Sequence, residues 1–435
     1  MKKMIIIGGG AAGMMTAIHA ADGYEVTLLE KNEKLGKKLF ITGKGRCNLT
    51  NACDEETFLQ NVMSNSRFLY SAISSYSPER VMDSFRQWGL SIKTERGNRV
   101  FPSSDHSSDV IKTLENEMRR RGVKILLSTE VRDILTEVLP EGGPEADRKG
   151  KGKNRPERRV TGVRLAGGKI LSADVVVLAA GGPSYPGTGA TNFGIRILND
   201  LGLTTRPFQP SLVPMMSDEA ICRTMMGLSL KNVELSFYLT SKPKKVLSRE
   251  FGEMLFTHFG VSGPLVLSAS GRLQKYFTAE GRPKEEMKFS IDWKPALSPE
   301  QLDARMIKDF ENAKNKKVEN AMEGLLPSSA ILPIINAAGL NPEKKIHDVT
   351  KEERLLLRDT LKAFTLPVKG LRGFDEAIIS AGGLSVKEVD PGTMEVKRIQ
   401  GLRVAGELLD CDALTGGFNL QIAWCTAYLA AKSFQ

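Results

Sequence analysis

The pattern of apolar and polar positions predicts strands and helices of one nucleotide-binding domain at both ends of the chain. The apolar run 4–7 leads into a glycine-rich turn and a helical stretch, and a second strand pattern covers 25–29. The run 174–180 is apolar throughout and ends at two glycines, which is typical of a strand buried on both faces of a parallel sheet. Residues 418–431 have the pattern of a final helix. We therefore expect an α/β domain built from both chain ends.

The middle of the chain has a different pattern. Residues 123–139 are expected to form a pair of strands and 160–171 a hairpin, while 207–293 is rich in short strand patterns and turns. Residues 298–363 are mostly helical, with charged faces. We predict four parts, which are the first part of the nucleotide-binding domain, an inserted β-rich domain, a helical subdomain and the last part of the nucleotide-binding domain. Their boundaries are 1–200, 201–297, 298–370 and 371–435.

The turn 8–13 has the glycine spacing of a dinucleotide-binding motif. Gly8 permits a tight turn, Gly10 lets the backbone approach a pyrophosphate, and Gly13 lets the helix pack closely on the strand. The start of the helix then directs its amides and positive dipole toward the phosphates. Glu30 follows the second strand, where a carboxylate can accept hydrogen bonds from both hydroxyls of an adenosine ribose. The alternative is an ordinary strand-to-helix turn that binds nothing.

Length and composition exclude several classes of protein. The 435 residues suffice for about three domain-sized units, and 41% apolar and 26% charged residues are typical of a globular protein. No apolar run approaches the roughly 18 residues of a membrane span, and the chain begins directly with a core strand. The five cysteines and four histidines are scattered, so neither disulfides nor a metal site is expected. We expect a cytoplasmic protein with no membrane association.

The charge of the chain favours polyanionic partners. The formal net charge is +10, a field that attracts molecules such as RNA. Residues 140–159 contain glycine, proline and charged residues without an apolar period, and basic side chains outnumber acidic ones. We expect this segment to be a disordered, solvated loop. Two interpretations stay open, a basic loop that reaches for phosphates and the solvated tip of a hairpin.

The C-terminal region favours FAD over NAD. Residues 401–407 form an apolar strand that ends in glycine and an acid, similar to the place where a carboxylate meets the ribityl chain in flavoproteins of the glutathione reductase type. Residues 415–421 then begin the last helix, and a helix N-terminus at the flavin ring stabilises the negative charge of the reduced ring. A glycine-rich turn before a core helix is the alternative. One dinucleotide motif is present, so we expect FAD to bind tightly and NAD(P)H to visit transiently as reductant.

Several segments resemble the bacterial aminoacetone oxidase-like flavoproteins, also called BaiN-like or RdsA-like. These segments are spread over nearly the whole chain and cover 38–51, 181–186, 252–264 and 405–421. The resemblance implies a Rossmann-type FAD-binding domain, glutathione reductase-like and built from both chain ends, with an inserted β-barrel-like domain and a helical subdomain. The basic segment after Pro140 departs from the family pattern.

The resemblance also implies a set of cofactor-binding residues. From the pyrophosphate through the ribose and adenine to the flavin and ribityl chain, they are Gly8, Gly10, Ala12 and Gly13; Glu30 and Lys31; Val131 through its backbone; Gly43, Arg46, Cys47 and Asn48; Gly181; and Gly406, Glu407, Asn419, Leu420 and Gln421. For Arg46, a purely structural ion pair is the alternative.

The activities of the family span three substrate classes, namely a uracil base of large-subunit ribosomal RNA, small amines and unsaturated steroids. The basic charge favours the RNA, whose uridine would be reduced to dihydrouridine. Cys47 and His258 are the candidate acids that would protonate the base after hydride addition. For both, a structural role is the alternative. Other open functions are an FAD oxidase or reductase of a small molecule (an aminoacetone-like amine or an unsaturated steroid), and an RNA-binding assembly factor in which FAD is structural.

Overall fold

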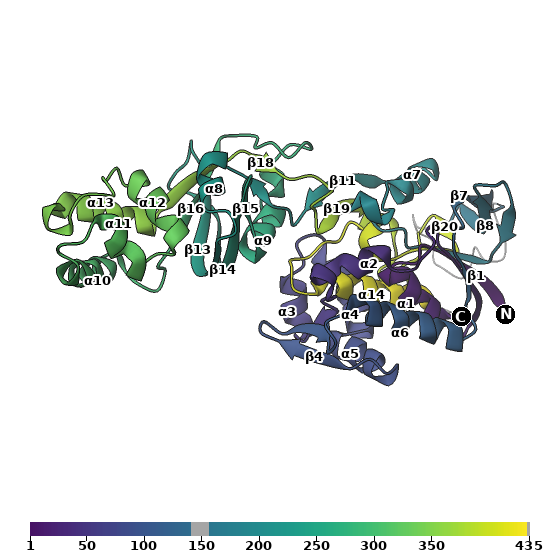
Figure 1. Ribbon diagram of the computed structural model, residues 1–435. Helices are drawn as coiled ribbons and strands as arrows, with labels where there is room; N and C mark the ends of the chain where they lie inside the picture. The colour runs from purple at the N-terminus through teal and green to yellow at the C-terminus, as the bar shows by residue number, and fades with distance from the viewer. Residues whose placement is uncertain (141–155, 433–435) are drawn as a thin grey trace. The chain divides into compact units, whose positions relative to one another are not determined.

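The computed structural model describes residues 1–140 and 156–432, and it divides into two compact units (Figure 1). The first unit combines Met1–Pro210 with Ile378–Gln435, and the second is Ser211–Ala377. Within the described ranges, no helix combines the length and the apolar character that crossing a membrane requires.

A five-stranded parallel sheet forms the centre of the first unit. Its strand order is β21-β10-β1-β2-β6, with bounds Leu402–Val404, Val175–Leu178, Lys2–Ile7, Tyr24–Leu29 and Lys124–Leu126. All four residues of β10 are buried, as the uninterrupted apolar run predicts for an interior strand. Because β1 and β21 come from opposite ends of the sequence, the prediction of a Rossmann-type domain built from both chain ends is confirmed.

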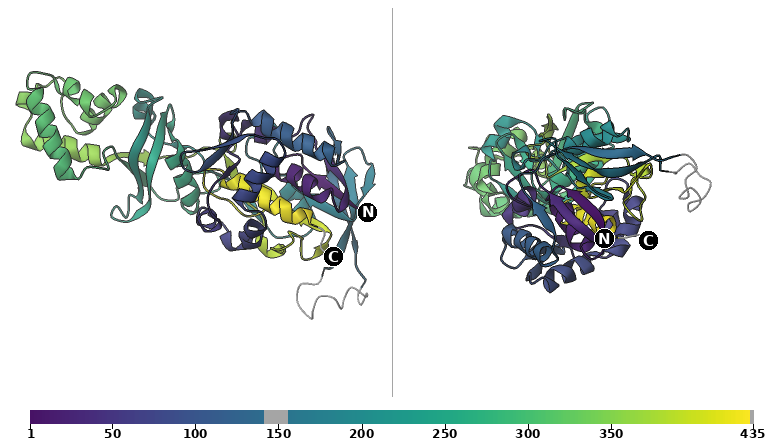
Figure 2. Two further views of the ribbon diagram at one scale, coloured as in Figure 1. Left: turned by 90° about the horizontal axis from the view of Figure 1, so that it is seen from below. Right: turned by 90° about the vertical axis from the view of Figure 1, so that its right-hand side faces the viewer.

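The first and last helices pack against each other in the same unit. Helix α1 spans Ala11–Ala20 and contacts α14, which spans Phe418–Ala431. Figure 2 shows the yellow C-terminal helix along the purple N-terminal one. Helix α14 carries apolar side chains of its own on all sides, and eleven of its residues are buried. This pattern is typical of a helix in the core. Tertiary packing therefore brings together the motifs that open and close the sequence.

The strands predicted at 123–139 exist, but the prediction that they pair with each other is wrong. Strand β6 lies in the parallel sheet, whereas β7 (Val131–Val138) pairs with β8 (Arg158–Leu165) in a separate antiparallel sheet. The chain turns between them at Ser128, which has a φ of +48°, and Thr129 N then donates to Glu30 O. The hairpin predicted at 160–171 is confirmed as β8 with β9 (Ile170–Ser172). Of the basic segment predicted as a loop, 140–159, residues 141–155 lie outside the described residues. At its end the prediction is wrong, because Arg158 and Arg159 belong to β8 and pair with β7.

Short elements complete the first unit around this framework. The strands are β3 (Thr50–Asn51), β4 (Ile92–Glu95), β5 (Arg99–Pro102), β11 (Thr205–Ser211), β19 (Ile379–Leu384) and β20 (Ile399–Gln400). The helices are α2 (Lys37–Ile41), α3 (Glu55–Gln60), α4 (Tyr70–Ser75), α5 (Pro78–Gln87), α6 (Ser107–Arg120) and α7 (Phe193–Asp200).

The second unit contains a seven-stranded antiparallel sheet. In sheet order its strands are β17 (Phe364–Val368), β16 (Met287–Asp292), β13 (Ser229–Leu239), β14 (Val246–Thr257), β15 (Gly260–Ser262), β12 (Met215–Met216) and β18 (Gly370–Leu371). The edge strands β17 and β18 are separated in sequence by Lys369 alone, so the two edges of the sheet come close together. The sheet is therefore curled, in agreement with the inserted β-barrel-like domain that the family resemblance implies.

Helices make up the rest of the second unit. They are α8 (Glu219–Thr224), α9 (Pro264–Arg272), α10 (Pro299–Asn312), α11 (Val318–Ala321), α12 (Ser328–Ala337) and α13 (Lys351–Lys362). Capping boxes begin two of them, Ser298 with Gln301 at α10 and Thr350 with Glu353 at α13. The helical pattern predicted for 298–363 is confirmed.

Candidate functional site

The glycine-rich turn between β1 and α1 leaves room for a ligand at one position. A Cβ added to Gly8, whose φ is +107°, would lie 2.5 Å from Ala179 O, and one added to Gly13 would lie 1.8 Å from Gly8 O. Around Gly10, in contrast, no heavy atom of the described residues lies within 4 Å of an added Cβ. Ala12 is buried behind the turn. The turn therefore has the shape that close approach of a pyrophosphate requires.

Glu30 points back at this turn from the end of β2. Its Oε2 accepts a hydrogen bond from Gly9 N at 2.7 Å, and its Oε1 accepts from Asn32 N at 2.8 Å and Asn32 Nδ2 at 2.7 Å. Lys31 is exposed beside it. Asn32 was missed in the sequence, although an amide side chain two residues after a carboxylate is a local signal for such a contact.

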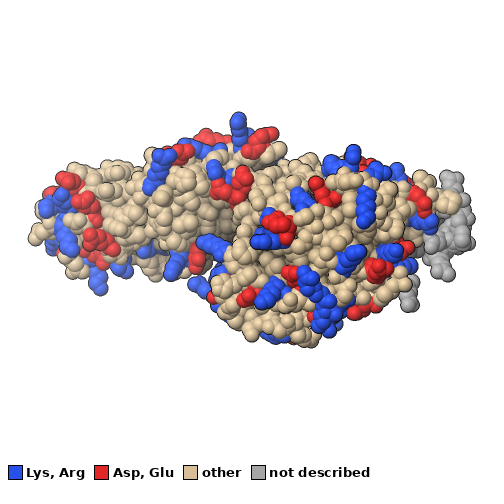
Figure 3. Space-filling model, turned by 45° about the vertical axis from the view of Figure 1, so that its right-hand side comes forward, with Lys and Arg blue, Asp and Glu red and all other residues tan. Residues whose placement is uncertain are grey.

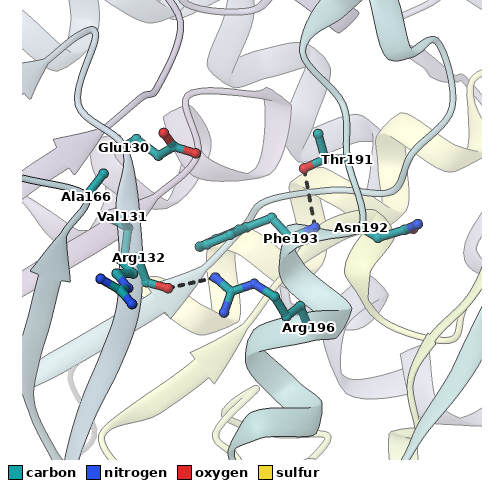
Figure 4. A pocket seen from close by; sticks show the side chains of 8 residues that line it. All are labelled: Glu130, Val131, Arg132, Ala166, Thr191, Asn192, Phe193 and Arg196. Carbon is teal, nitrogen blue, oxygen red and sulfur yellow. Dashed lines mark hydrogen bonds between the residues drawn. The ribbon is translucent and has the colours of Figure 1, made fainter.

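A pocket of about 420 Å³ lies beside the predicted adenine-contacting residue, Val131 (Figure 4). The ring of Phe193 extends across it toward β7, and Arg196 Nη2 donates to Arg132 O at 2.7 Å. The remaining lining residues are Glu130, Ala166, Thr191 and Asn192. Phe193 and Arg196 carry no sequence signal for this place, because α7 is brought to β7 by tertiary packing alone.

The loop that follows α2 has an unusual backbone. Gly43, Lys44 and Cys47 have φ values of +58°, +59° and +58°, and such a conformation is uncommon for residues other than glycine. Within the described chain, the buried Oδ1 of Asn48 has no hydrogen-bond partner. A flavin ring carries both donors and acceptors, so an unsatisfied amide oxygen in this loop fits the expected cofactor.

Arg46, which the resemblance assigns to the flavin, forms a cluster of ion pairs. Its Nε donates to Asp105 Oδ1 at 2.8 Å, its Nη2 contacts Glu95, and its guanidinium lies 4.1 Å from the centroid of the Phe101 ring. The hydrogen bond from Arg46 lowers the pKa of the Glu95 carboxyl. The pKa of Asp105 is lowered by Lys93 first and by Arg46 second. This geometry matches the structural alternative for Arg46.

The two candidate acids lie in different units. Cys47 is fully buried in the first unit, and burial raises the pKa of its thiol to about 12. His258 is exposed in the second unit, at the turn between β14 and β15, with its ring edge-on to Phe259. The thiol therefore keeps its proton at neutral pH, and the imidazole is accessible from solvent.

The glycines after β10 and β21 surround a carboxylate. Gly181 and Gly406 have φ values of +66° and +75°. Glu407 Oε2 accepts a hydrogen bond from Lys38 Nζ at 2.7 Å, and its Oε1 accepts from Ser380 N at 2.8 Å. Lys38 and Ser380 were missed in the sequence. Lys38 lies inside a segment that resembles the family, so its position held a signal that was not used.

At the start of α14, the polar side chains are bound to other parts of the protein, and the backbone amides are left to meet a ligand. Asn419 uses its amide to bind Ala413 N at 2.9 Å and Ala413 O at 2.7 Å. The buried Gln421 donates to Tyr76 O at 2.8 Å, and Leu420 is partly buried. The N-cap residue is Gly417, with a φ of +100°. The amides at the start of the helix are thus the groups through which α14 can meet a cofactor.

Four of the predicted cofactor residues lie at one edge of the parallel sheet. Gly8, Glu30, Gly181 and Gly406 each follow the carboxyl end of a different strand, namely β1, β2, β10 and β21. Open α/β sheets bind their ligands at this edge. In the part of the chain that the structure describes, no group of three or more His, Cys, Asp or Glu side chains is arranged to hold a metal ion.

Comparison with known proteins also indicates a Rossmann-type domain. Residues 2–433 match the family described as HI0933-like protein Rossmann domain. The chain is 30% identical to the 3-dehydro-bile acid delta(4,6)-reductase of Clostridium scindens, with 100% of this chain and 99% of the relative covered. It is 26% and 27% identical to the ribosomal RNA dihydrouridine synthases of Haemophilus influenzae and Escherichia coli, covering 97% and 96% of them and 99% and 98% of this chain.

Solved structures share the fold at low identity. The open conformation of a flavocytochrome c3 fumarate reductase has a TM-score of 0.50 at 14% identity, with 99% of this chain and 77% of that chain covered. The 3-ketosteroid-delta4-(5alpha)-dehydrogenase from Rhodococcus jostii RHA1 has the same TM-score and identity, with 99% and 97% covered.

The fold and the site define an FAD-dependent oxidoreductase with a Rossmann-type FAD-binding domain. More narrowly, the chain belongs to the HI0933-like protein Rossmann domain family, whose model covers it almost from end to end. The resemblance to the BaiN-like and RdsA-like flavoproteins is thereby confirmed.

Proposed function

We propose that this enzyme reduces a carbon–carbon double bond conjugated to a carbonyl, that NAD(P)H is its reductant, and that its substrate is a uridine of large-subunit ribosomal RNA in the cytoplasm. The observation that carries the proposal is the full-length similarity to two kinds of reductase, one named for a 3-dehydro delta(4,6) bile acid and one for dihydrouridine. Both substrates place a double bond in conjugation with a carbonyl, so a single site chemistry serves both.

The reaction adds one hydride and one proton across the double bond. When bound, reduced FAD supplies the hydride from N5 of its ring. In uracil the hydride adds at C6, negative charge builds on O4, and an acid delivers a proton to C5. The base must leave its stack to reach the site edge.

Two side chains are proposed as the proton donor. Cys47 lies in the strained loop 43–48 and retains its proton, because burial raises its thiol pKa to about 12. His258 is accessible at the tip of a β-hairpin, where a large substrate can contact it. Cys47 is the donor favoured by its place in the first unit, which carries the cofactor residues.

The choice of RNA is supported by charge. The net charge of +10 attracts a phosphate backbone over long range. On the face drawn in Figure 3, Lys and Arg side chains are spread over the surface among Asp and Glu, without one dominant basic patch. This distribution favours general attraction over a single phosphate clamp on that face.

The second candidate is a reductase of a small unsaturated ketone of the steroid type. It is favoured by the 30% identity to the bile acid reductase, which exceeds the 26% and 27% identity to the two RNA enzymes. The conjugated carbonyl chemistry is the same, but a small neutral ligand has little use for the basic charge of the chain.

Mass spectrometry of ribosomal RNA tests the substrate. RNA from cells that have the gene is expected to contain a uridine heavier by about two daltons, the mass of one hydride and one proton, than in cells that lack it. An equal uridine mass in RNA from both kinds of cell contradicts the RNA proposal. Anaerobic reoxidation of the reduced enzyme by an RNA fragment or by a steroid dienone then separates the two candidates, and rapid reoxidation by air alone favours an oxidase.

Complementation with variants tests the proton donor. Cys47→Ala or His258→Asn is expected to abolish the modified uridine if that residue is the donor, while the FAD content is retained. Cys53→Ala and His347→Asn are matched controls, because Cys53 is partly buried nearby in sequence and His347 is exposed in the same unit as His258. Full modification by both test variants removes both residues from the mechanism.

A further inference from the structure

Lys38 joins three segments that follow three different strands of the parallel sheet. Its Nζ lies 2.7 Å from Glu407 Oε2 and 3.4 Å from Gly182 O. Lys38 belongs to α2, which follows β2, whereas Gly182 follows β10 and Glu407 follows β21. The carboxyl ends of these strands meet at the ligand-binding edge of the sheet. The ammonium group therefore crosses the same edge that carries the cofactor residues.

The partner carboxylate is held on its other side as well. Glu407 Oε1 accepts from Ser380 N at 2.8 Å, and Ser380 Oγ is hydrogen-bonded to Ser184 Oγ at 2.6 Å. Both serines are buried, and a Cβ added to Gly182 would lie 2.6 Å from Ser380 Oγ. The backbone around Glu407 is therefore closely packed, and Lys38 supplies the one contact on this carboxylate that carries a full positive charge among the described residues.

The partial burial of Lys38 and Glu407 strengthens the interaction between their charges. The Lys38 and Glu407 side chains are 25% and 22% exposed, so water screens the pair less than it screens a surface pair. Without Lys38, a partly buried carboxylate would stand uncompensated at the edge that receives the negatively charged pyrophosphate of FAD.

We propose that Lys38 is the internal counter-ion of Glu407 and a positioning residue for FAD. Its charge holds the Glu407 carboxylate toward the hydroxyl groups of the ribityl chain and offsets the repulsion between this carboxylate and the pyrophosphate. The inference concerns cofactor binding and is independent of which substrate is reduced.

The test measures FAD affinity by fluorescence titration of the full-length apoprotein. Lys38→Met is expected to weaken FAD binding about tenfold or more. Lys38→Arg keeps the charge and should bind FAD nearly as the wild type does. The double variant K38M/E407Q should bind FAD more tightly than K38M, because the uncompensated charge is gone. Lys37→Met is the matched control on the same helix, since its partner Glu33 is 63% exposed.

Two results would overturn the proposal. One is an unchanged FAD affinity of K38M, and the other is a double variant at least as weak as K38M, which would assign Lys38 a packing role only. Thermal unfolding of each apoprotein shows whether a variant is folded. Should K38M fail to fold, the FAD affinities of the single variants K38R and E407Q keep the test decisive. Because the readout is FAD binding, it is unaffected by failure of the RNA proposal.

Discussion

Thr50 Oγ1 donates a hydrogen bond of 2.7 Å to Gln421 Oε1 across 371 positions of the sequence. The same glutamine donates from Nε2 to Tyr76 O at 2.8 Å, and Trp424 Nε1 donates to Leu49 O at 2.8 Å. These three bonds are buried. The first of them joins the two longest segments that resemble the family, 38–51 and 405–421, and the other two hold the same helix to Tyr76 and Leu49. The N-terminal loop and the C-terminal helix therefore form one packed framework.

This relationship predicts that Gln421 stabilises the first unit. Gln421→Leu would leave the Thr50 hydroxyl and the Tyr76 carbonyl buried without this partner, at a cost of about 2–4 kcal/mol in the free energy of unfolding. Gln87→Leu, on the exposed face of α5, is the control and should change stability by less than about 0.5 kcal/mol. Urea unfolding of the apoprotein measures both values. Equal effects of the two variants would contradict the structural role of Gln421.

The glycine-rich turn predicts opposite behaviour for two of its glycines. Gly10→Ala should leave the stability of the apoprotein nearly unchanged, because an added Cβ has free space, but it should weaken FAD binding about tenfold or more by blocking the pyrophosphate. Gly13→Ala should destabilise the apoprotein itself, because its Cβ would lie 1.8 Å from Gly8 O. Thermal unfolding and FAD titration separate the two effects. A G10A protein with unchanged FAD affinity would place the pyrophosphate elsewhere.

His19 predicts a pH dependence of stability. The pKa of its imidazole is lowered from 6.5 to about 4. Burial is the largest cause, and the charge of the nearby Arg121 is the second. Between these values the unfolded chain binds a proton that the folded protein does not, so stability is present above pH 6.5 and falls by about 3 kcal/mol in total as the pH drops toward 4.

The comparison with His19→Gln isolates this contribution. The stability of the wild type should fall more steeply than that of H19Q between pH 6.5 and 4, as measured by urea unfolding of the apoproteins at a series of pH values. His347→Gln, at an exposed position, is the control for the loss of one imidazole. Parallel curves for wild type and H19Q would show that His19 titrates normally in the folded protein.

The buried thiols predict a pattern of chemical reactivity. Alkylation requires the thiolate, and burial raises the pKa of Cys47 to about 12. In the native protein at pH 8, iodoacetamide should therefore leave Cys47 unmodified. Cys53 is partly exposed, and burial raises the pKa of its thiol only to about 11, so Cys53 should react before Cys47. Peptide mass spectrometry reads the sites, and labelling in urea is the control. Native labelling of Cys47 as fast as Cys53 would show that its loop opens.

Local patterns in the sequence were enough to predict the framework of this enzyme. The run 4–13 with Glu30, the apolar strand 174–180 and the strand before Gly406 depend on neighbouring residues, because glycine spacing and apolar periods act over one turn or one strand. The strands 123–127 and 130–135 show the limit of such patterns. Each strand was predictable, but its partner was not, because pairing depends on where the chain turns at Ser128.

Tertiary structure alone decided how the site is assembled. It directed Arg46 to Glu95 and Asp105, and it brought Lys38 to Glu407 across 369 positions. The sequence determined by itself a two-ended dinucleotide-binding domain and the residues available to it. Which of these side chains face the cofactor and which hold the protein together was decided by long-range packing, because a side chain's partners are set by where distant segments meet.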